Sequence, residues 1–510
     1  MQTTQQKIQN LDSLEIKSKQ LNEKGKRIVL CHGTFDLIHT GHIRHLQEAK
    51  KQGDVLFATI TADRCVLKGP GRPVFPENLR AENLSALSCV DYVGIVHEQT
   101  AEQPILKIKP HIYVKGTEYK NATNDLTGNI IKEKELVEKF GGKLYFTNDI
   151  TFSSSSLINE YFRVFSNETR DYLSKISEKF SSKEIINLLE TLKSQKVLVI
   201  GDTIIDEYHY TVPLGQAGKG HHLAVKYQAT EQFAGGVLAV ANHIADFSGS
   251  VTLVTGLGEN DSFEDFIRNK LQEKIEPKFF YKKNSRTLVK RRFVDNDLIK
   301  LFEVYLADED ELLPPDLDDK ICNWLNSELG KFDVVVIPDF GHGFISEKMI
   351  QVLEKKSNFL AVNTQVNSGN RGSHAISRYS RADLVSLNEP ELRLATHNRY
   401  DCVESLAKKL CQSMNIKNIA VTQGTKGAII LSHDTKEIHR APVLSTKVID
   451  RIGAGDAFLS LAGICLGGDL PANLTTFIAS AAAALDVQIV CNRNPITSVE
   501  LYKYITTMLK

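Results

Sequence analysis

The sequence has little of the chemistry that marks secreted, membrane-bound or nucleic-acid-binding proteins. Lysine and arginine together number 62, as do aspartate and glutamate, so the net charge is +0 and gives no support to binding of nucleic acid or a membrane surface. No stretch is apolar for the length of a membrane span, and the first 26 residues lack the apolar centre of a signal peptide. We therefore expect a cytoplasmic protein without nucleic-acid or membrane partners.

Cysteine is also sparse. The eight cysteines are scattered singly, without a C-x-x-C pair or a Cys/His cluster at zinc-ligand spacing. Isolated cysteines of this kind usually behave as small core residues in a reducing compartment. A disulfide framework and a structural zinc site are therefore not expected.

Two α/β rhythms follow one another along the 510 residues. The first covers residues 27–160, where RIVLCHG, DVLFATIT and DYVGIV are separated by helical stretches. The second begins at KVLVIGD and continues through SVTLVTGLG, FDVVVIPDF and NIAVTQG. Strands that alternate with helices form parallel sheets covered by helices. We expect one α/β domain at 1–165 and another at 195–510, joined by a charged helical connector at 166–194.

Two further stretches of the second domain have a different pattern. Residues 208–232 and 286–305 alternate polar and apolar side chains, as half-buried strands do. They predict a small β lid laid over the main sheet.

The sharpest local signal is GTFDLIHTGH, from Gly33 to His42, which follows the first predicted strand and opens the first helix. The free N–H groups and the dipole of a helix start favour an anion, and the imidazoles of His39 and His42 can donate to phosphate oxygens. Gly33 and Gly41 let the backbone approach a nucleotide closely. This pattern predicts a triphosphate site, and the structural alternative is a pair of satisfied histidines.

The same segment resembles the H-x-G-H motif of the cytidylyltransferase-like nucleotidyltransferases, and the resemblance covers residues 27–160. It implies a Rossmann-like domain in which a phosphate oxygen attacks the α-phosphorus of a nucleoside triphosphate and pyrophosphate leaves. Positioning and charge stabilisation then supply the catalysis. By this resemblance His39, His42 and Lys68 are catalytic, with Lys68 on a mobile loop over the phosphates. The nucleotide-binding residues implied are Gly33, Thr34, Phe35, Asp36, Gly41, Lys50, Arg80, Lys115, Gly116, Ser154, Ser155 and Ser156.

Taken one by one, these lysines and arginines would more often be solvated surface charges, and the serine run a helix cap or linker. Their order and spacing favour the site. Across LKGPGRPVFPENLR, VDYV and VKG-x-x-Y the likeness is closest to the adenylyltransferase half of the bifunctional ADP-heptose synthesis enzymes. Glycerol-phosphate cytidylyltransferases share the framework but less of the loop, so ATP is favoured and CTP stays open.

The second strong signal is DRIGAGDAF, from Asp450 to Phe458, directly before an apolar helix. A G-A-G-D turn at a helix start presents N–H groups to a transferring phosphoryl group, and its Asp456 can take the proton of an acceptor hydroxyl. The sequence resembles the signature of the ribokinase-type (PfkB) carbohydrate kinases over about residues 195–510, which implies a ribokinase-like α/β/α fold with Asp456 as the base.

Other elements follow in the order of that family. The resemblance implies that Gly453, Ala454, Gly455, Gly424 and Gly427 bind nucleotide. It implies that the sugar contacts Asp202, Asp206, Gly235 and Gly236, and that Asn388 and Glu391 organise magnesium indirectly. Structural alternatives are open for each, such as a tight turn for the glycine pair and a cap for Asp202.

Three departures from the family pattern cluster on the acceptor side. Ala239 stands where the heptose kinases have asparagine, with Asn242 a potential substitute; Asn363-Thr364-Gln365 replaces the usual Asp-Pro-Lys; and Arg451 replaces threonine. These changes leave the identity of the sugar open.

Together the motifs predict a bifunctional enzyme that makes a nucleotide-activated sugar of the ADP-heptose type, with Mg²⁺ and ATP in both sites. Its partners would be nucleoside triphosphates and sugar phosphates, and by resemblance it would form a homodimer. The heptose enzymes place the kinase first, whereas here the nucleotidyltransferase leads. The alternatives are a CTP-dependent enzyme for a polyol or other sugar phosphate, and a nucleotidyltransferase fused to a non-catalytic binding or dimerisation module.

Overall fold

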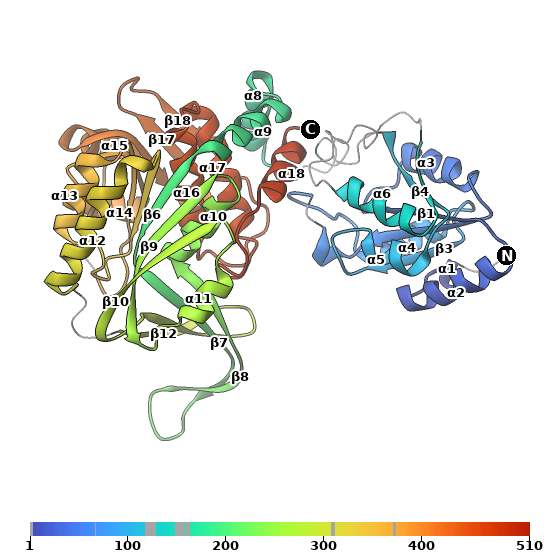
Figure 1. Cartoon of the computed structure of the whole chain (residues 1–510), viewed down its shortest axis with the longest axis horizontal. Helices are drawn as coiled ribbons and strands as arrows, with labels where there is room; N and C mark the ends of the chain where they lie inside the picture. The colour runs from blue at the N-terminus through green and yellow to red at the C-terminus, as the bar shows by residue number, and fades with distance from the viewer. Residues whose placement is uncertain are drawn as a thin grey trace. The chain divides into compact units, whose positions relative to one another are not determined.

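The computed structural model describes residues 4–66, 68–117, 129–147, 159, 164–307, 312–370 and 374–510 (Figure 1). The chain divides into two compact units, which we call the first unit (Met1–Ser166 with Tyr502–Lys510) and the second unit (Asn167–Leu501). Among the helices of the described residues, none combines the length and the apolar character that crossing a membrane requires.

A five-stranded parallel sheet, in the order β3-β2-β1-β4-β5, forms the centre of the first unit. Its strands are β1 (Ile28–Gly33), β2 (Val55–Thr61), β3 (Tyr92–Val96), β4 (Ile112–Lys115) and β5 (Lys143–Phe146). The helices are α1 (Thr4–Lys7), α2 (Leu11–Glu23), α3 (Thr40–Lys50), α4 (Glu77–Ser85), α5 (Glu102–Ile108) and α6 (Asn129–Lys139).

Both faces of this sheet are covered, because its strands are apolar on both sides. Alternate residues of β1 pack into two separate cores: Val29 and Cys31 join Leu46 of α3 and Leu84 of α4, whereas Leu30 joins a cluster with α2, α5 and α6. A parallel sheet between two helical layers is the Rossmann-like arrangement that the sequence predicts.

The strand order places a topological switch point between β1 and β4. The chain leaves β1 toward β2 on one side and leaves β4 toward β5 on the other, so the loops after Gly33 and after Lys115 diverge. In open α/β sheets, ligands bind at the carboxyl ends of the strands beside such a point. This edge of the sheet therefore holds the first candidate site.

The second unit contains two sheets. The nine-stranded sheet, in the order β10-β9-β6-β13-β14-β15-β16-β17-β18, is parallel from β10 to β16 and antiparallel from β16 to β18. Its strands are β6 (Lys196–Gly201), β9 (Ser250–Asn260), β10 (Ile275–Arg286), β13 (Val334–Asp339), β14 (Phe359–Thr364), β15 (Arg381–Asn388), β16 (Asn415–Thr422), β17 (Ala428–Ser432) and β18 (Ile438–Ala441).

The smaller sheet has the order β12-β11-β7-β8 and occupies the region where the sequence predicts a lid (Figure 1). Its strands are β7 (Thr203–Gln216), β8 (Leu223–Gly236), β11 (Val289–Val294) and β12 (Lys300–Leu306). Because β7 follows β6 after a single residue, the lid is joined directly to the carboxyl edge of the main sheet.

The helices of the second unit are α8 (Asn167–Lys179), α9 (Ser182–Thr191), α10 (Val237–Ala245), α11 (Glu264–Lys270), α12 (Pro315–Glu328), α13 (Glu347–Lys356), α14 (Glu389–Ala395), α15 (Val403–Ser413), α16 (Ala454–Gly467) and α17 (Ala472–Asp486). The last helix, α18 (Ser498–Met508), begins in the second unit, and its residues from 502 onward belong to the first unit. One apolar core fills the space between the sheet and α12, α13, α14 and α15. Helices α10 and α16 pack on the sheet and contact each other, and α17 packs against α16.

The boundaries differ from the expected ones in two places. The connector is helical as predicted, but it groups with the second unit: Leu173 and Leu189 are buried, and the ring of Tyr172 lies 6.3 Å from that of Phe477. Residues 502–510, expected in the second domain, group with the first unit. Neither grouping is visible from the order of the elements along the chain.

Candidate active sites

Two histidines are fixed at the amino end of α3. His39 is the N-cap, and its Nδ1 accepts a hydrogen bond of 3.1 Å from the N–H of Gly41. The Nδ1 of His42 lies 3.1 Å from the carbonyl oxygen of Leu37, which can only accept. The two rings stack with centroids 4.1 Å apart. In their neutral forms, His39 therefore carries its proton on Nε2 and His42 on Nδ1.

Both imidazoles favour the neutral form. Burial, with contributions from the nearby His39 and the Lys68 ammonium, lowers the pKa of His42 to about 3. Burial also lowers the pKa of His39. An anion close to these rings would oppose this effect, because an opposite charge favours the protonated imidazole. Without a bound anion both rings are therefore mainly neutral at pH 7, and a phosphate group would shift them toward the protonated form.

The loop from β1 to α3 holds a second loop in place. Thr34, Phe35 and Asp36 are buried. The Asp36 carboxylate accepts hydrogen bonds from the N–H of Val74, at 2.8 and 2.9 Å, and from the N–H of Phe75, at 3.0 Å. We call residues 68–75 the Lys68 loop. Asp36 thus acts as a loop anchor, and Lys68 itself is exposed.

Arg80 connects backbone segments within the protein and is not exposed to bind a phosphate. Its side chain is fully buried and donates to the carbonyl oxygens of Phe75, Thr34 and Thr61, at 2.9, 2.5 and 2.8 Å, and to Asp63 Oδ1 at 2.6 Å. Four of its five donors are used within the protein. Arg80 ties together the loops that leave β1 and β2, and so positions the site without facing it.

Lys50 does not reach this site, contrary to the sequence prediction. It is the last residue of α3, roughly 15 Å along the helix from its amino end. Its ammonium donates to Asp91 Oδ2 at 2.5 Å and to the carbonyl oxygen of Asp54 at 2.6 Å, at the opposite edge of the sheet. The spacing along the sequence suggested a ligand, but helix geometry carries Lys50 away.

Lys115 ends β4 at the switch point, and Gly116 follows it. The Lys115 ammonium lies 3.0 Å from Glu133 Oε2 and over the ring of Tyr113. Its charge is among the causes that lower the pKa of His32, so Lys115 lies near the end of β1. Ser154, Ser155 and Ser156 lie outside the described residues.

His32, which the sequence motifs do not point to, lies near the end of β1. Its Nδ1 lies 3.0 Å from Thr59 Oγ1, and its Nε2 lies 3.3 Å from Thr61 Oγ1. Burial lowers the pKa of His32 to about 3, with Lys115 and Lys68 contributing. A histidine directly before Gly33 at the end of a strand was the available signal, since side chains there lie at the carboxyl edge.

In the second unit, the G-A-G-D turn forms the amino end of α16. Gly453 is the N-cap with φ 101°, and a Cβ there would lie 2.6 Å from Asn492 Oδ1 and 2.7 Å from Asp486 Oδ2. Only glycine fits this conformation and this space. Ala454 and Gly455 form the first turn, and a Cβ at Gly455 would meet nothing within 4 Å. The N–H groups of this turn are therefore placed to receive an anion.

Asp456 lies in that first turn beside other charged groups. Burial, together with the negative charges of Asp206 and Glu391, raises the pKa of its carboxyl to about 7, and the Lys290 ammonium partly opposes this rise. A carboxyl with a pKa near the working pH can accept a proton from a hydroxyl group. The geometry thus joins Asp456 and Asp206, which lie far apart in the sequence, in one acidic cluster.

The glycine pair allows Asp206 to lie against the backbone. Asp206 forms an ion pair with Arg292, and a Cβ at Gly235 would lie 1.9 Å from Asp206 Oδ2. Gly236 has φ 59°, and a Cβ there would lie 2.6 Å from the carbonyl oxygen of Asp202. Any side chain at 235 would displace the Asp206 carboxylate.

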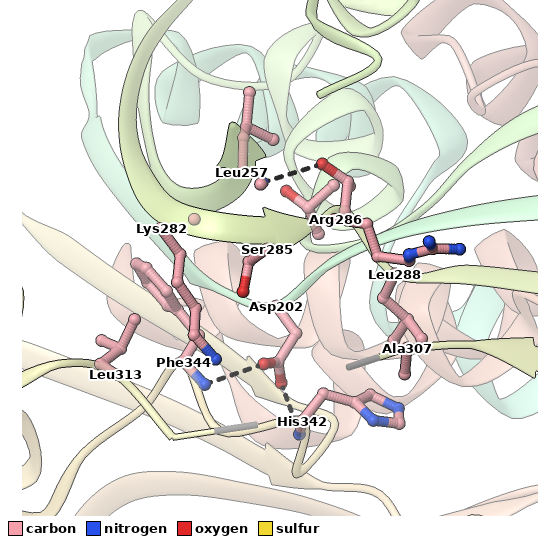
Figure 2. Close-up of a pocket in the computed structure, with 14 residues that line it drawn as sticks. Asp202, Leu257, Lys282, Ser285, Arg286, Leu288, Ala307, Leu313, His342 and Phe344 are labelled. Carbon is pink, nitrogen blue, oxygen red and sulfur yellow. Dashed lines mark hydrogen bonds between the residues drawn. The ribbon is translucent and has the colours of Figure 1, made fainter. Parts of the chain in front are cut away.

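Asp202 lines a cavity of about 90 Å³ (Figure 2). Its carboxylate accepts hydrogen bonds from the backbone N–H of His342, at 3.3 Å, and of Phe344, at 3.1 Å. Burial and the Asp339 carboxylate raise the pKa of Asp202 to about 6. Other lining residues include Lys282, Ser285, Arg286, Leu257, Leu313 and Ala307.

Asn388 and Glu391 form a reciprocal capping box at the start of α14. Asn388 Oδ1 accepts from the N–H of Glu391 at 2.8 Å, and Glu391 Oε2 accepts from the N–H of Asn388 at 2.8 Å. Glu391 Oε1 accepts from the N–H of Val366 at 3.2 Å. Burial raises the pKa of Glu391 to about 7. Within the described ranges no group of three His, Cys, Asp or Glu side chains could hold a metal ion.

Gly424 and Gly427 shape the turn between β16 and β17, with φ 56° and 83°. A Cβ at Gly427 would lie 2.0 Å from the carbonyl oxygen of Ala441, so the close approach of β18 requires glycine there. Both glycines thus have a structural role, and the turn lies beside the carboxyl end of β16.

The residues that depart from the family pattern on the acceptor side make contacts within the protein. Ala239 is buried in α10, and Asn242 does not take its place, because its side chain bonds the backbone of Lys270 and Gln272 at 3.1 Å each. Asn363 donates to the carbonyl oxygen of Ser386 at 2.7 Å. The polar stretch that follows supplies His374, whose Nε2 lies 3.0 Å from Asp339 Oδ1. These residues stabilise the loops around Asp202.

Comparison with known proteins gives a match for each unit. Residues 194–496 match the pfkB family carbohydrate kinase model, and residues 30–161 match the cytidylyltransferase-like model. These matches confirm the α/β fold class and the order of the two domains' families along the chain.

Curated relatives match over shorter stretches. A protein named "Bifunctional protein HldE" from Nitratiruptor sp. is 42% identical over 143 residues, which is 28% of this chain and 30% of that protein. The protein of the same name from Geobacter metallireducens is 38% identical over 168 residues, 32% of each chain. The chain therefore spans about a third of the length of these curated relatives.

Among solved structures, ribokinase from Giardia lamblia is 20% identical and covers 60% of this chain and 99% of its own, with a TM-score of 0.49. Phosphofructokinase-2 from Escherichia coli is 14% identical and covers 62% and 100%, with a TM-score of 0.49. The sequence match at residues 194–496 takes in more than half of the chain. The chain therefore belongs to the pfkB family of carbohydrate kinases, with a cytidylyltransferase-like segment ahead of its kinase fold.

Proposed function

We propose that this chain is a bifunctional enzyme that makes a nucleotide-activated sugar of the ADP-heptose type. The first unit would transfer a nucleotidyl group, preferably from ATP, to a sugar 1-phosphate. The second would phosphorylate a sugar or sugar phosphate with ATP. One observation carries the proposal: each unit places a helix amino end and its own titratable group at the carboxyl edge of a parallel sheet. The HldE relatives, whose name includes the word bifunctional, support it.

In the first unit the triphosphate would bind at the amino end of α3. His39 donates from Nε2, and His42 gains a proton as the anion approaches, so that it also donates. The sugar phosphate oxygen forms a bond to the α-phosphorus while the bond to the bridging oxygen breaks, and pyrophosphate leaves with that electron pair. The Lys68 ammonium offsets the charge on the leaving group.

In the second unit Asp456 would take the proton of the acceptor hydroxyl. The hydroxyl oxygen then attacks the γ-phosphorus of ATP, and ADP leaves. The N–H groups of the turn at 453–455 stabilise the charge on the transferred group. Asp206, held by Arg292 and Gly235, would bind acceptor hydroxyls. Its negative charge also raises the pKa of Asp456.

The acceptor itself is proposed to carry a phosphate. The cavity beside Asp202 has Lys282 and Arg286 among its lining residues (Figure 2). Two cationic side chains suit a phosphate group, whereas Asp202 and the backbone suit hydroxyl groups. A sugar phosphate could therefore place its phosphate in this cavity and its reacting hydroxyl near Asp456.

Magnesium is proposed in both sites, because bound nucleoside triphosphates need charge neutralisation. The carboxylate oxygens of Glu391 each accept a backbone N–H, so Glu391 and Asn388 would meet a nucleotide-bound Mg²⁺ through water. The ion would supply electrostatic stabilisation of the phosphate charge. We also propose that the protein is a cytoplasmic homodimer.

Two variants of the full chain test the assignment. His42→Ala should abolish pyrophosphate release and leave ADP formation unchanged, and Asp456→Asn should do the reverse. Each variant controls for the folding of the other. Pyrophosphate release that persists in His42→Ala would refute the first site. ADP formation that persists in Asp456→Asn would mean that the second unit is not a kinase with Asp456 as its base.

A further inference from the structure

The Lys68 loop rests on residues from the end of the chain. Gly69, next to Lys68, has φ 93°, and a Cβ there would lie 3.2 Å from Thr507 Cγ2 and 3.6 Å from Tyr504 Cδ2. Thr507 and Tyr504 are themselves 7% and 1% exposed. The backbone of Gly69 therefore packs closely on Thr507, and its positive φ favours glycine at this position.

A single amide group links the same two segments. Arg72 Nη2 donates to Asn159 Oδ1 at 2.8 Å, and Asn159 Nδ2 donates to the carbonyl oxygen of Thr507 at 2.8 Å. Thr507 lies in the last turn of α18, where carbonyl groups lack partners within the helix. Asn159 therefore satisfies one of these carbonyls and fixes Arg72 at the same time.

The Lys68 loop is thus held at both of its ends. Asp36 holds Val74 and Phe75 at one end, and the contacts of Gly69 and Arg72 hold the other. Lys68 is exposed at that second end, yet its charge lowers the pKa of His42. The place of the Lys68 ammonium near His42 therefore depends on what holds Gly69.

We propose that residues 502–510, linked through Asn159, are a positioning element of the nucleotidyltransferase site. By holding Gly69 they keep Lys68 where charge develops on the leaving pyrophosphate. The inference rests on the proposed nucleotidyl transfer. A lysine on an unconstrained loop would lose more conformational freedom at each turnover, and a displacement of about 1 Å can cost up to a hundredfold in rate. Because the interaction strengthens in the transition state, kcat is affected rather than KM.

The first test uses pyrophosphate release by the full chain. Asn159→Ala and Thr507→Ala should each lower kcat about tenfold with KM for the nucleotide nearly unchanged. Thr191→Ala makes the same change at an exposed position of α9 and should keep wild-type kcat. ADP formation serves as the folding control in every variant. A fall in ADP formation equal to that in pyrophosphate release, or an unchanged kcat in both variants, would overturn the proposal.

A double-mutant cycle tests whether the effect acts through Lys68. In a Lys68→Ala background, Thr507→Ala should cause no further loss, whereas independent effects would multiply and overturn the proposal. If the wild-type chain releases no pyrophosphate, the proposed function fails by itself. Hydrogen exchange at residues 68–75 then decides the positioning role: faster exchange in Asn159→Ala supports it, and unchanged exchange refutes it.

Discussion

Replacing Asp456 by asparagine should abolish phosphoryl transfer and stabilise the second unit at the same time. The environment of this carboxyl raises its pKa from 3.8 to about 7, so the ionised form is disfavoured in the folded chain. Each pKa unit corresponds to about 1.36 kcal/mol between the two protonation states, which gives at most about 4 kcal/mol. Because Asp456 keeps part of its hydration, we expect about 2 kcal/mol.

The sign of the effect depends on pH. Below pH 3.8 the carboxyl is protonated in the folded and unfolded chains, and its ionisation has no cost. As pH rises from 3.8 to about 7, the unfolded chain loses the proton first, so the stability contributed by Asp456 falls, and above pH 7 the loss is complete. The advantage of Asp456→Asn should therefore be about 2 kcal/mol at pH 8 and below about 1 kcal/mol at pH 5.

Calorimetry of the full chain at the two pH values measures this difference. For a unit of this size, about 2 kcal/mol corresponds to a rise in Tm of about 3 °C at pH 8. Asp265→Asn, at an exposed position in the first turn of α11, is the matched control and should change stability by less than about 0.5 kcal/mol. An equal gain at both pH values, or a loss at pH 8, would refute the reasoning.

Three further outcomes follow from the geometry. Binding of a nucleoside triphosphate at pH 7 should take up a proton on His42, whose pKa is about 3 in the free protein, so calorimetric heats should depend on the buffer in the wild type and less in His42→Asn. Gly235→Ala should abolish ADP formation and lower the free energy of unfolding by about 2 kcal/mol, because its Cβ would lie 1.9 Å from Asp206 Oδ2. Normal ADP formation in this variant would exclude the close packing of Gly235 on Asp206. Lys50→Ala should leave pyrophosphate release within about twofold of wild type, because Lys50 pairs with Asp91 at the other edge of the sheet; a tenfold loss would return it to the site.

Local signals predict the parts of each candidate site that lie within one short segment. GTFDLIHTGH and DRIGAGDAF each contain a strand or loop end, a turn and a helix start in consecutive residues, and helix starts bind anions by geometry alone. The α/β alternation likewise predicted both parallel sheets and the lid, because hydrophobic period is a local property.

The remaining assignments depend on contacts that no local pattern encodes. The role of Arg80 is set by carbonyl groups 5 to 46 residues away, and Lys50 is paired with Asp91 across 41 residues. Asn159 donates a hydrogen bond to Thr507 across 348 residues. Because no local pattern encodes such a contact, residues 502–510 were expected in the other domain. His32 gains its hydrogen bonds only when β1 pairs with β2. Such partners become visible once the chain is folded.

Turnover of the wild-type chain with defined substrates tests the central claim most directly. Pyrophosphate release should be measured with ATP and with CTP against a panel of sugar 1-phosphates and polyol phosphates that includes heptose 1-phosphate. The account predicts release with ATP and heptose 1-phosphate that His42→Ala abolishes. Release only with CTP and another phosphate would retain the chemistry of the first site but contradict the ADP-heptose assignment, and no release with any pair would contradict nucleotidyl transfer itself.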